Sequence, residues 1–188
     1  MTRAKILVTG GAGFIGGNFV QYMVQRHPEY EICNLDSLTY AGELSKHRNI
    51  ERMGNYRFIK ADITERETIL SIFDKERFEF IVHFAAESHV DRSILDPGIF
   101  VRTNVMGTQI LLEAAKKYRV AKFVHVSTDE VYGELTFDPT TFFTEETPLR
   151  PNSPYSASKA ASDLLVRAYH ETFGLPVNIT RCSNNYGP

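Results

Sequence analysis

The chain has 188 residues, 43% of them apolar and 23% charged, which is the composition of a globular protein able to bury one core. With 21 Lys and Arg against 23 Asp and Glu, its net charge of −2 excludes the basic surface of a nucleic-acid binder or a polybasic membrane binder. Apolar runs stay well short of a membrane span and no signal peptide is recognisable. Cys33 and Cys182 are far apart and lack metal spacing, so we expect a reducing, cytoplasmic compartment.

Short β-branched runs alternate with stretches of helical periodicity along the chain. We expect strands at 5–8, 31–35, 56–59, 80–84, 122–126 and 176–180. We expect helices at 14–26, 65–75, 100–118 and 153–173. This alternation predicts an α/β, Rossmann-type fold with a doubly wound parallel sheet, forming one dinucleotide-binding domain over residues 1–188. Because the strands are nearly apolar throughout, we expect helices on both faces of the sheet.

Cap residues and long connections mark the ends of these elements. Asp96-Pro97 and Ser153-Pro154 each combine a capping side chain with a proline that suits the first helical position. The connections at 36–55 and 133–152 are long for a compact domain, and such loops are usually either functional or disordered.

A glycine-rich turn follows the first expected strand and opens the first expected helix. Gly10, Gly13 and Gly16 allow a tight turn, close approach of the backbone to a pyrophosphate, and close packing of the helix on the strand. Gly11 offers a second register of the same fingerprint. The alternative is a strand–helix turn whose glycines serve packing alone. A phosphate-loop NTPase is excluded because no Gly-Lys-Ser/Thr follows.

Asp36 ends the second expected strand, 20 residues after the last glycine of the turn. A carboxylate there can accept hydrogen bonds from both ribose hydroxyls and repels a 2′-phosphate. The next residue is Ser37 and not an arginine, so the pattern favours NAD over NADP as cofactor.

Two further segments lie at the carboxyl ends of strands. Asp62-Ile63 could border the adenine, or Asp62 could simply cap the helix expected at 65–75. Ala85-Ala86 could let a ligand lie against the backbone, or could reflect tight packing.

Tyr155 and Lys159 lie four residues apart in the first turns of a helix, and therefore on one face. A neighbouring ammonium and a nicotinamide cation would favour the phenolate and lower the pKa of the tyrosine. This pair could then remove a hydroxyl proton while hydride leaves the same carbon. The alternative is an amphipathic helix with a surface tyrosine and lysine.

Thr128, Asp129 and Glu130 end the fifth expected strand, where ligands bind in doubly wound sheets. Adjacent carboxylates repel each other, so one can act as acid and the other as base, as an elimination requires. The alternative is a helix N-terminus with a cap and acidic first-turn residues. His83, His89 and His125 lack ligand spacing, and we predict no metal site.

Six segments together make the chain resemble the extended short-chain dehydrogenase/reductase family, and within it the dTDP-glucose 4,6-dehydratases. They are Thr9–Gly16, Asp36–Gly42, Ala85–Ser93, Ser127–Gly133, Ser153–Lys159 and Ser183–Pro188. The glycine turn and the Tyr/Lys pair are shared with sugar epimerases, decarboxylases and reductases. The acid pair is more selective, because epimerase relatives usually lack it.

The resemblance implies an NAD-dependent enzyme that converts dTDP-glucose into a 4-keto-6-deoxy sugar, as in a rhamnose route to surface polysaccharide. It assigns catalysis to Thr128, Asp129, Glu130, Tyr155 and Lys159. It assigns cofactor binding to Gly10, Gly13, Phe14, Ile15, Gly16, Asp36, Ser37, Leu38, Thr39, Asp62, Ile63, Phe84, Ala85, Ala86, Ser88, Thr103, Tyr155, Lys159 and Asn185. It assigns substrate binding to Ser88, Thr128 and Asn184.

The resemblance carries three further expectations. A smaller C-terminal lobe that grips the nucleotide of the substrate would be missing from this chain, so little turnover is expected of these residues alone. A homodimer would form through the helices at 100–118 and 153–173. The remaining alternatives are a nucleotide-sugar 4-epimerase or decarboxylase of the same family, or a non-catalytic dinucleotide-binding module.

Overall fold

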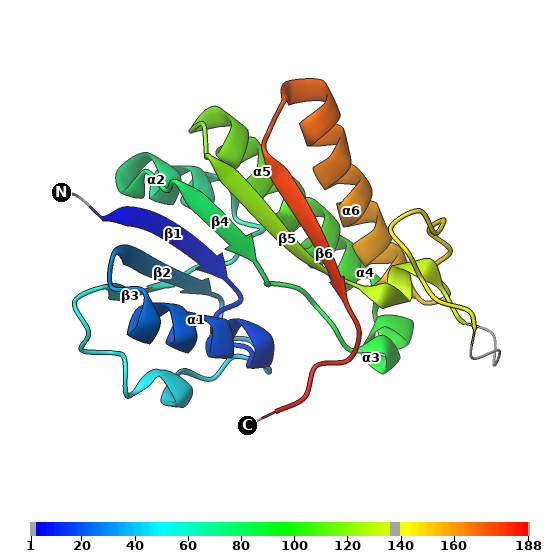
Figure 1. Ribbon diagram of the computed structural model, residues 1–188, viewed down its shortest axis with the longest axis horizontal. Helices are drawn as coiled ribbons and strands as arrows, with labels where there is room; N and C mark the ends of the chain where they lie inside the picture. The colour runs from blue at the N-terminus through cyan, green and yellow to red at the C-terminus, as the bar shows by residue number, and fades with distance from the viewer. Residues whose placement is uncertain (1–2, 136–139, 188) are drawn as a thin grey trace.

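The structure is a computed structural model that describes residues 3–135 and 140–187 (Figure 1). The middle of the long connection at 133–152 and the final Pro188 lie outside the described residues. Six parallel strands form one sheet in the order β3-β2-β1-β4-β5-β6, which confirms the predicted doubly wound fold. The strands are β1 Ala4–Thr9, β2 Tyr30–Asp36, β3 Tyr56–Lys60, β4 Phe80–His83, β5 Lys122–Thr128 and β6 Val177–Cys182.

Long helices fill the connections after β1, β3, β4 and β5, as predicted, whereas the connection from β2 to β3 holds only a short helical segment. The long ones are α1 Phe14–Arg26, α2 Arg66–Glu76, α5 Thr108–Lys117 and α6 Pro154–Phe173. Shorter helical segments are η1 Leu44–His47, α3 Val90–Leu95, α4 Pro97–Phe100, η2 Val101–Gly107 and η3 Asp129–Tyr132. Of these, η1 and α3 were not predicted. None of the helices within the described ranges combines the length and the apolar character needed to cross a bilayer.

The two faces of the sheet are covered unequally (Figure 1). Helices α2, α5 and α6 pack on one face and bury a large core around Leu7, Ile81 and Phe123. Helix α1 packs on the other face over β1 and β2, where Val20 and Val24 join a smaller core.

The second face of β4, β5 and β6 is only half covered, contrary to the expectation of helices over both faces. Burial alternates along these strands: Ile81 and Phe123 are fully buried, whereas Val82 and Val124 are half-buried and Asn178 is exposed. The reason is that α1 covers β1 and β2, and no other described helix packs on that face.

The helix expected at 100–118 is continuous but irregular. It begins at Pro97, after Asp96, passes through the π-helical segment η2, and continues as α5. The π turn lies at Asn104, which is buried at 1% exposure. A Cβ at Gly107 would lie 2.5 Å from the Cδ1 atom of Ile63, so this helix approaches the loop after β3 closely.

Helix α6 has strong end signals, as its sequence predicted. The Ser153 hydroxyl accepts a hydrogen bond from the Ser156 backbone at 3.0 Å, and the Ser156 hydroxyl accepts one from the Ser153 backbone at 3.0 Å. Pro154 occupies the first turn, and Gly174 ends the helix in the left-handed conformation. These ends set the position of the face that carries Tyr155 and Lys159.

Candidate active site

A cleft of about 570 Å³ opens at the carboxyl edge of the sheet. Its walls come from the segments that follow β1, β2, β3 and β4, together with the end of β5, η2 and α6. It brings together seventeen of the predicted site residues: Gly10, Gly13, Phe14, Ile15, Gly16, Asp36, Ser37, Thr39, Asp62, Ile63, Phe84, Ala85, Ala86, Ser88, Thr103, Tyr155 and Lys159.

The glycine turn forms the floor of the cleft at the start of α1. Gly10 has φ of +72°, and a Cβ there would lie 2.5 Å from the backbone nitrogen of Ala85, so both conformation and space require glycine. A Cβ on Gly16 would collide with the Gly10 carbonyl oxygen. No side chain caps the N-terminus of α1, which faces the cleft. Its backbone donors and partial positive charge suit a phosphate group.

Asp36 links the glycine turn to the loop after β2. One carboxylate oxygen accepts a hydrogen bond from the Ala12 backbone at 3.0 Å, and the other accepts one from the Leu38 backbone at 2.8 Å. Leu38 has φ of +58°, so the carboxylate stabilises a conformation that leucine rarely adopts. Each oxygen keeps a further lone pair for a ligand.

Asp62 does not cap α2, so that alternative is wrong. Glu65 holds the N-cap position, and the Asp62 carboxylate accepts a hydrogen bond from the Thr64 backbone at 2.8 Å. Asp62 thereby shapes the loop wall of the cleft next to Ile63.

An aromatic and cationic contact joins two walls of the cleft, and sequence reasoning missed it. The Arg92 guanidinium lies 3.8 Å from the ring centre of Tyr40, and the His89 ring lies 6.0 Å from the same ring. Arg92 also lies 3.9 Å from the buried carboxylate of Glu87. Tyr40 and His89 both line the cleft, so the loop after β2 and helix α3 meet across it.

Tyr155 and Lys159 lie side by side in the wall formed by α6. The Lys159 ammonium donates a hydrogen bond to the Val126 carbonyl of β5 at 2.8 Å. Burial lowers the pKa of Lys159 to about 8, against the opposing effect of the Asp163 carboxylate. Burial raises the pKa of Tyr155 to about 12, with Glu130 adding to the rise and the Thr128 hydroxyl opposing it.

The protein's own groups act against the expected lowering of the Tyr155 pKa. Burial and the negative charge of Glu130 raise this pKa, and the Thr128 hydroxyl opposes the rise. The expectation also included a nicotinamide cation, which is the charge that would favour the phenolate when NAD is bound.

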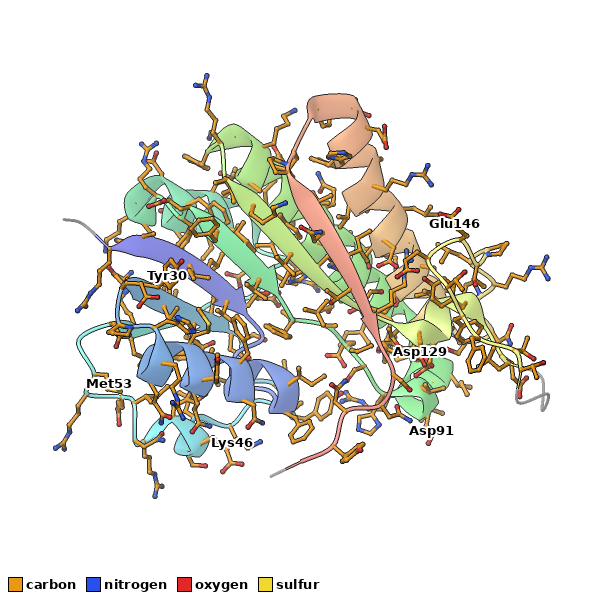
Figure 2. All side chains as sticks on the ribbon, in the orientation of Figure 1. Tyr30, Lys46, Met53, Asp91, Asp129 and Glu146 are labelled. Carbon is orange, nitrogen blue, oxygen red and sulfur yellow. The ribbon has the colours of Figure 1, made fainter. Side chains whose placement is uncertain are left out.

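Thr128, Asp129 and Glu130 form the junction between β5 and the short helix η3. The Thr128 hydroxyl accepts a hydrogen bond from the Glu130 backbone at 3.3 Å and donates one to the Asp129 carboxylate at 3.4 Å. The N-cap interpretation is thus correct, and both carboxylates lie near enough to Tyr155 to raise its pKa. Burial and the adjacent Asp129 raise the pKa of Glu130. Figure 2 shows Asp129 at this end of the sheet.

Thr128, Asp129 and Glu130 do not line the cleft itself. Three further predicted binding residues also lie outside it. The Leu38 backbone N–H donates a hydrogen bond to the Asp36 carboxylate. Asn184 and Asn185 are exposed in the segment after β6, and the Asn185 amide donates hydrogen bonds to Cys182 and to the Ser183 carbonyl. The structure does not bring these side chains to the other site residues.

Asn104 is a site residue that sequence reasoning missed. Its amide accepts a hydrogen bond from the Glu87 backbone at 2.8 Å and donates to the Glu87 carbonyl at 2.9 Å and to the Ser158 hydroxyl at 2.8 Å. It therefore fixes the loop after β4 to the first turns of α6, next to Lys159. No signal in the sequence distinguishes this asparagine from the other polar residues of the helix.

His83 and His125 lie in the core behind the site. His83 shares hydrogen bonds with the hydroxyls of Thr9 at 2.7 Å and Thr108 at 2.9 Å. The two imidazole rings lie 5.3 Å apart, and burial lowers the pKa of both. Their contacts support the prediction of core histidines.

Comparison with known proteins gives the same family from sequence and from structure. The model of the family described as GDP-mannose 4,6 dehydratase matches residues 7–188. The dTDP-glucose 4,6-dehydratase of Xanthomonas campestris pv. campestris (strain B100) is 54% identical, over 98% of this chain and 54% of that protein. The chain thus spans about half the length of the curated relatives it matches.

Solved structures divide into close and more distant neighbours. The Bacillus anthracis dTDP-glucose 4,6-dehydratase in complex with NAD is 52% identical with a TM-score of 0.89, over 98% of this chain and 56% of that one. The Thermotoga maritima UDP-glucose 4-epimerase with UDP-glucose is 33% identical with a TM-score of 0.87, over 98% and 57%. Fold alone does not separate dehydratases from epimerases, whereas sequence identity does. The chain belongs to the family described as GDP-mannose 4,6 dehydratase, and its relatives near 50% identity are dTDP-glucose 4,6-dehydratases.

Proposed function

We propose that this chain is the cofactor-binding and catalytic part of an NAD-dependent dTDP-glucose 4,6-dehydratase, a hydro-lyase. One observation carries the proposal: the carboxylates of Asp129 and Glu130 lie near enough to Tyr155 to raise its pKa, and Tyr155 and Lys159 line the cleft. An epimerase needs the tyrosine–lysine pair, but it needs no separate acid and base for removing water.

The cleft fits NAD in volume and in chemistry. The uncapped N-terminus of α1 suits the pyrophosphate, and the Asp36 carboxylate suits the ribose hydroxyls and repels a 2′-phosphate. When bound, NAD would accept a hydride from the sugar C4 and later return it to C6, which regenerates the cofactor in each turnover.

Tyr155 is the proposed base for the 4-hydroxyl of the glucose unit. The Thr128 hydroxyl is a partner of the phenol, and Ser88 lies across the cleft, where it can contact the sugar. Lys159, held by its hydrogen bond to Val126, supplies a positive charge that favours the phenolate. Proton removal by Tyr155 then accompanies oxidation at C4.

Asp129 and Glu130 are the proposed elimination pair. The new C4 ketone acidifies the proton on C5, which the Glu130 carboxylate removes. Asp129 donates a proton to the departing 6-hydroxyl, so water leaves and a C5–C6 double bond forms. Burial and the adjacent Asp129 raise the pKa of Glu130 above its usual range, which suits a group that exchanges a proton with the sugar.

The nucleotide end of the substrate is proposed to bind outside the residues described above. The relatives are longer than the segment that this chain matches, and the nucleotide would be held by their remaining length, with Asn184 near the junction. Binding energy from the nucleotide would position the sugar against the catalytic residues. The whole enzyme is therefore the form to assay.

A homodimer through the 100–118 and 153–173 helices is part of the proposal. Met106 of η2 and Leu164 and Phe173 of α6 are each more than half exposed, which is unusual for large apolar side chains on helices. Cys33 and Cys182 are both free thiols, which supports a reducing, cytoplasmic compartment for this biosynthetic step.

Substitution of the two acids in the complete enzyme tests the proposed reaction. With dTDP-glucose, Glu130→Gln and Asp129→Asn are each expected to lower formation of the 4-keto-6-deoxy product by at least about a hundredfold, the scale of general acid–base catalysis. Oxidation at C4, followed as transient NADH absorbance, should persist. Turnover within a few-fold of wild type in both variants contradicts the proposed acid and base. Epimerised sugar as product, or bound NAD without product from dTDP-glucose or UDP-glucose, would support the epimerase or the non-catalytic module instead.

A further inference from the structure

A buried carboxylate lies one helical turn beyond Lys159. Tyr155, Lys159 and Asp163 are spaced by four residues along α6 and therefore share one face of the helix. Asp163 is 1% exposed and Lys159 is 4% exposed, so both ionisable groups lie within the protein interior. Nothing in the proposed reaction assigns a role to Asp163.

Asp163 and Lys159 reach neighbouring residues of the same strand. The Lys159 ammonium donates to the Val126 carbonyl at 2.8 Å, and the Asp163 carboxylate lies 3.3 Å from His125 Nε2. Ser127, which belongs to the cleft wall, lies close enough to lower the pKa of Asp163. The carboxylate therefore lies directly behind the catalytic wall.

Arg181 of β6 holds the second carboxylate oxygen of Asp163. Its Nε donates to that oxygen at 2.8 Å, and its Nη1 donates to the Tyr132 hydroxyl at 2.8 Å. Tyr132 ends the short helix η3 that begins with Asp129. Arg181 thus fixes the carboxylate from the side opposite to His125 and ties α6 to the turn that carries the acid pair.

The charges around Lys159 leave Asp163 as its buried anionic partner. His125 is neutral near pH 7, because burial lowers its pKa to about 4, and burial lowers the pKa of His83 as well. The two acids of η3 lie on the Tyr155 side of the site. The titratable and charged groups that face this region are Tyr155 and Asp163 of α6, His83 of β4, His125 of β5, Arg181 and Cys182 of β6, and Asp129 and Glu130 of η3.

We infer that Asp163 is a positioning residue for the proposed reaction: it is the buried counter-ion that keeps Lys159 charged beside Tyr155, and Arg181 holds it in place. The inference deepens the proposed function and rests on it. An ammonium without a nearby anion is costly to bury, so loss of the carboxylate favours the neutral amine. A neutral amine no longer favours the Tyr155 phenolate.

The test is the titration of Lys159 in the complete enzyme, followed by NMR on protein labelled with ¹³C at the lysine ε-carbon and assigned with Lys159→Met. Asp163→Asn keeps the size and can still accept the Arg181 hydrogen bond, so its fold should survive. It is expected to lower the titration midpoint of Lys159 by about one pH unit. Arg181→Met removes the other cation that contacts Asp163, while His125 still contacts the carboxylate, so the Asp163 charge should act more strongly on Lys159 and raise that midpoint. Glu171→Gln removes an exposed carboxylate from the same helix and should leave it unchanged.

The opposite signs separate a counter-ion from a residue that only stabilises the fold. A midpoint that stays unchanged in Asp163→Asn, or that moves in the same direction in both variants, overturns the inference. If Asp163→Asn does not fold, Arg181→Met alone decides the question. A Lys159 midpoint that does not rise in Arg181→Met then overturns the inference.

Turnover provides the second readout. The alkaline limb of the pH–rate profile should move down with the Lys159 midpoint in Asp163→Asn and up in Arg181→Met. Midpoints that shift while wild-type enzyme makes no 4-keto sugar would contradict the proposed function and leave the counter-ion intact. Normal turnover with unchanged Lys159 midpoints in the variants would contradict the counter-ion inference and leave the proposed function intact.

Discussion

At the scale of single residues, the side chains proposed for chemistry also hold the local structure in place. The Thr128 hydroxyl caps η3 and contacts Asp129, and the Lys159 ammonium bonds the backbone of β5. Asp36 binds the backbone on both sides of the cofactor's expected ribose site. These hydrogen bonds hold the side chains in position, and a ligand can bind through their remaining donors and acceptors.

Asp36→Asn tests this double role by its effect on cofactor choice. The amide keeps one acceptor oxygen, so either the Ala12 or the Leu38 backbone donor loses its partner, and the charge that repels a 2′-phosphate is gone. The ratio of NAD to NADP affinity is expected to fall by about tenfold or more, the effect of losing one charged hydrogen bond. Calorimetric titration with both cofactors measures it, with the exposed Glu51→Gln as control. An unchanged ratio contradicts the role given to Asp36.

At the scale of elements, α6 and the irregular helix from Pro97 to Lys117 decide the shape of the site. The capping box at Ser153 sets where α6 begins, and hence the height of Tyr155 and Lys159 above the sheet. The π turn of η2 directs Asn104 inward, where it joins the loop after β4 to α6. The end signals of α6 could be read from the sequence, whereas the π turn could not. The spacing of apolar residues does not distinguish a turn with i→i+5 hydrogen bonds from one with i→i+4 hydrogen bonds.

Ser153→Ala tests the contribution of the capping box. Loss of the side-chain acceptor leaves a backbone N–H of the first turn of α6 without its partner and is expected to lower the free energy of unfolding by about 1 kcal/mol. Urea unfolding followed by circular dichroism measures the change. Ser71→Ala, at an exposed position inside α2, should change stability by less than about half that amount. Equal effects in both variants would show that the box does not anchor α6.

At the scale of the whole molecule, a line of buried polar groups crosses the sheet beneath α5 and α6. It runs from Thr9 through His83 and His125 to Asp163 and Arg181, joining β1 to β6. These groups are buried behind the cleft, and their ionisation is therefore coupled to folding. The two histidines must stay neutral in the folded protein.

The free energy of unfolding should therefore fall as the pH is lowered from about 6.5 to about 4. The pKa of His125 is lowered from 6.5 to about 4, so within this window the unfolded chain binds a proton that the folded protein excludes. The loss from His125 alone amounts to at most about 3 kcal/mol. Urea unfolding at several pH values measures it, and His125→Gln should reduce the slope. A slope that is the same in this variant would contradict the assignment to His125.

The local parts of the fold and site were predictable because they depend on local rules. Strand and helix periodicity gave the parallel sheet, the glycine turn needed Gly10 and Gly16, and Ser153-Pro154 marked the start of α6. The contact of Tyr40 with Arg92 and the partners of Asn104 were not predictable, because they join segments far apart in the chain.

By itself the sequence determined the doubly wound sheet, the glycine turn with Asp36, and the spacing of Tyr155 and Lys159, since each follows from a short repeating pattern or a motif at one strand end. The tertiary structure alone decided the half-covered face of the sheet, the raised pKa of Tyr155 and the placement of Asp163 between His125 and Arg181. Those properties depend on how much water and charge surround a group. Burial and charge at a point in space are set by residues from many parts of the chain, so no local pattern records them.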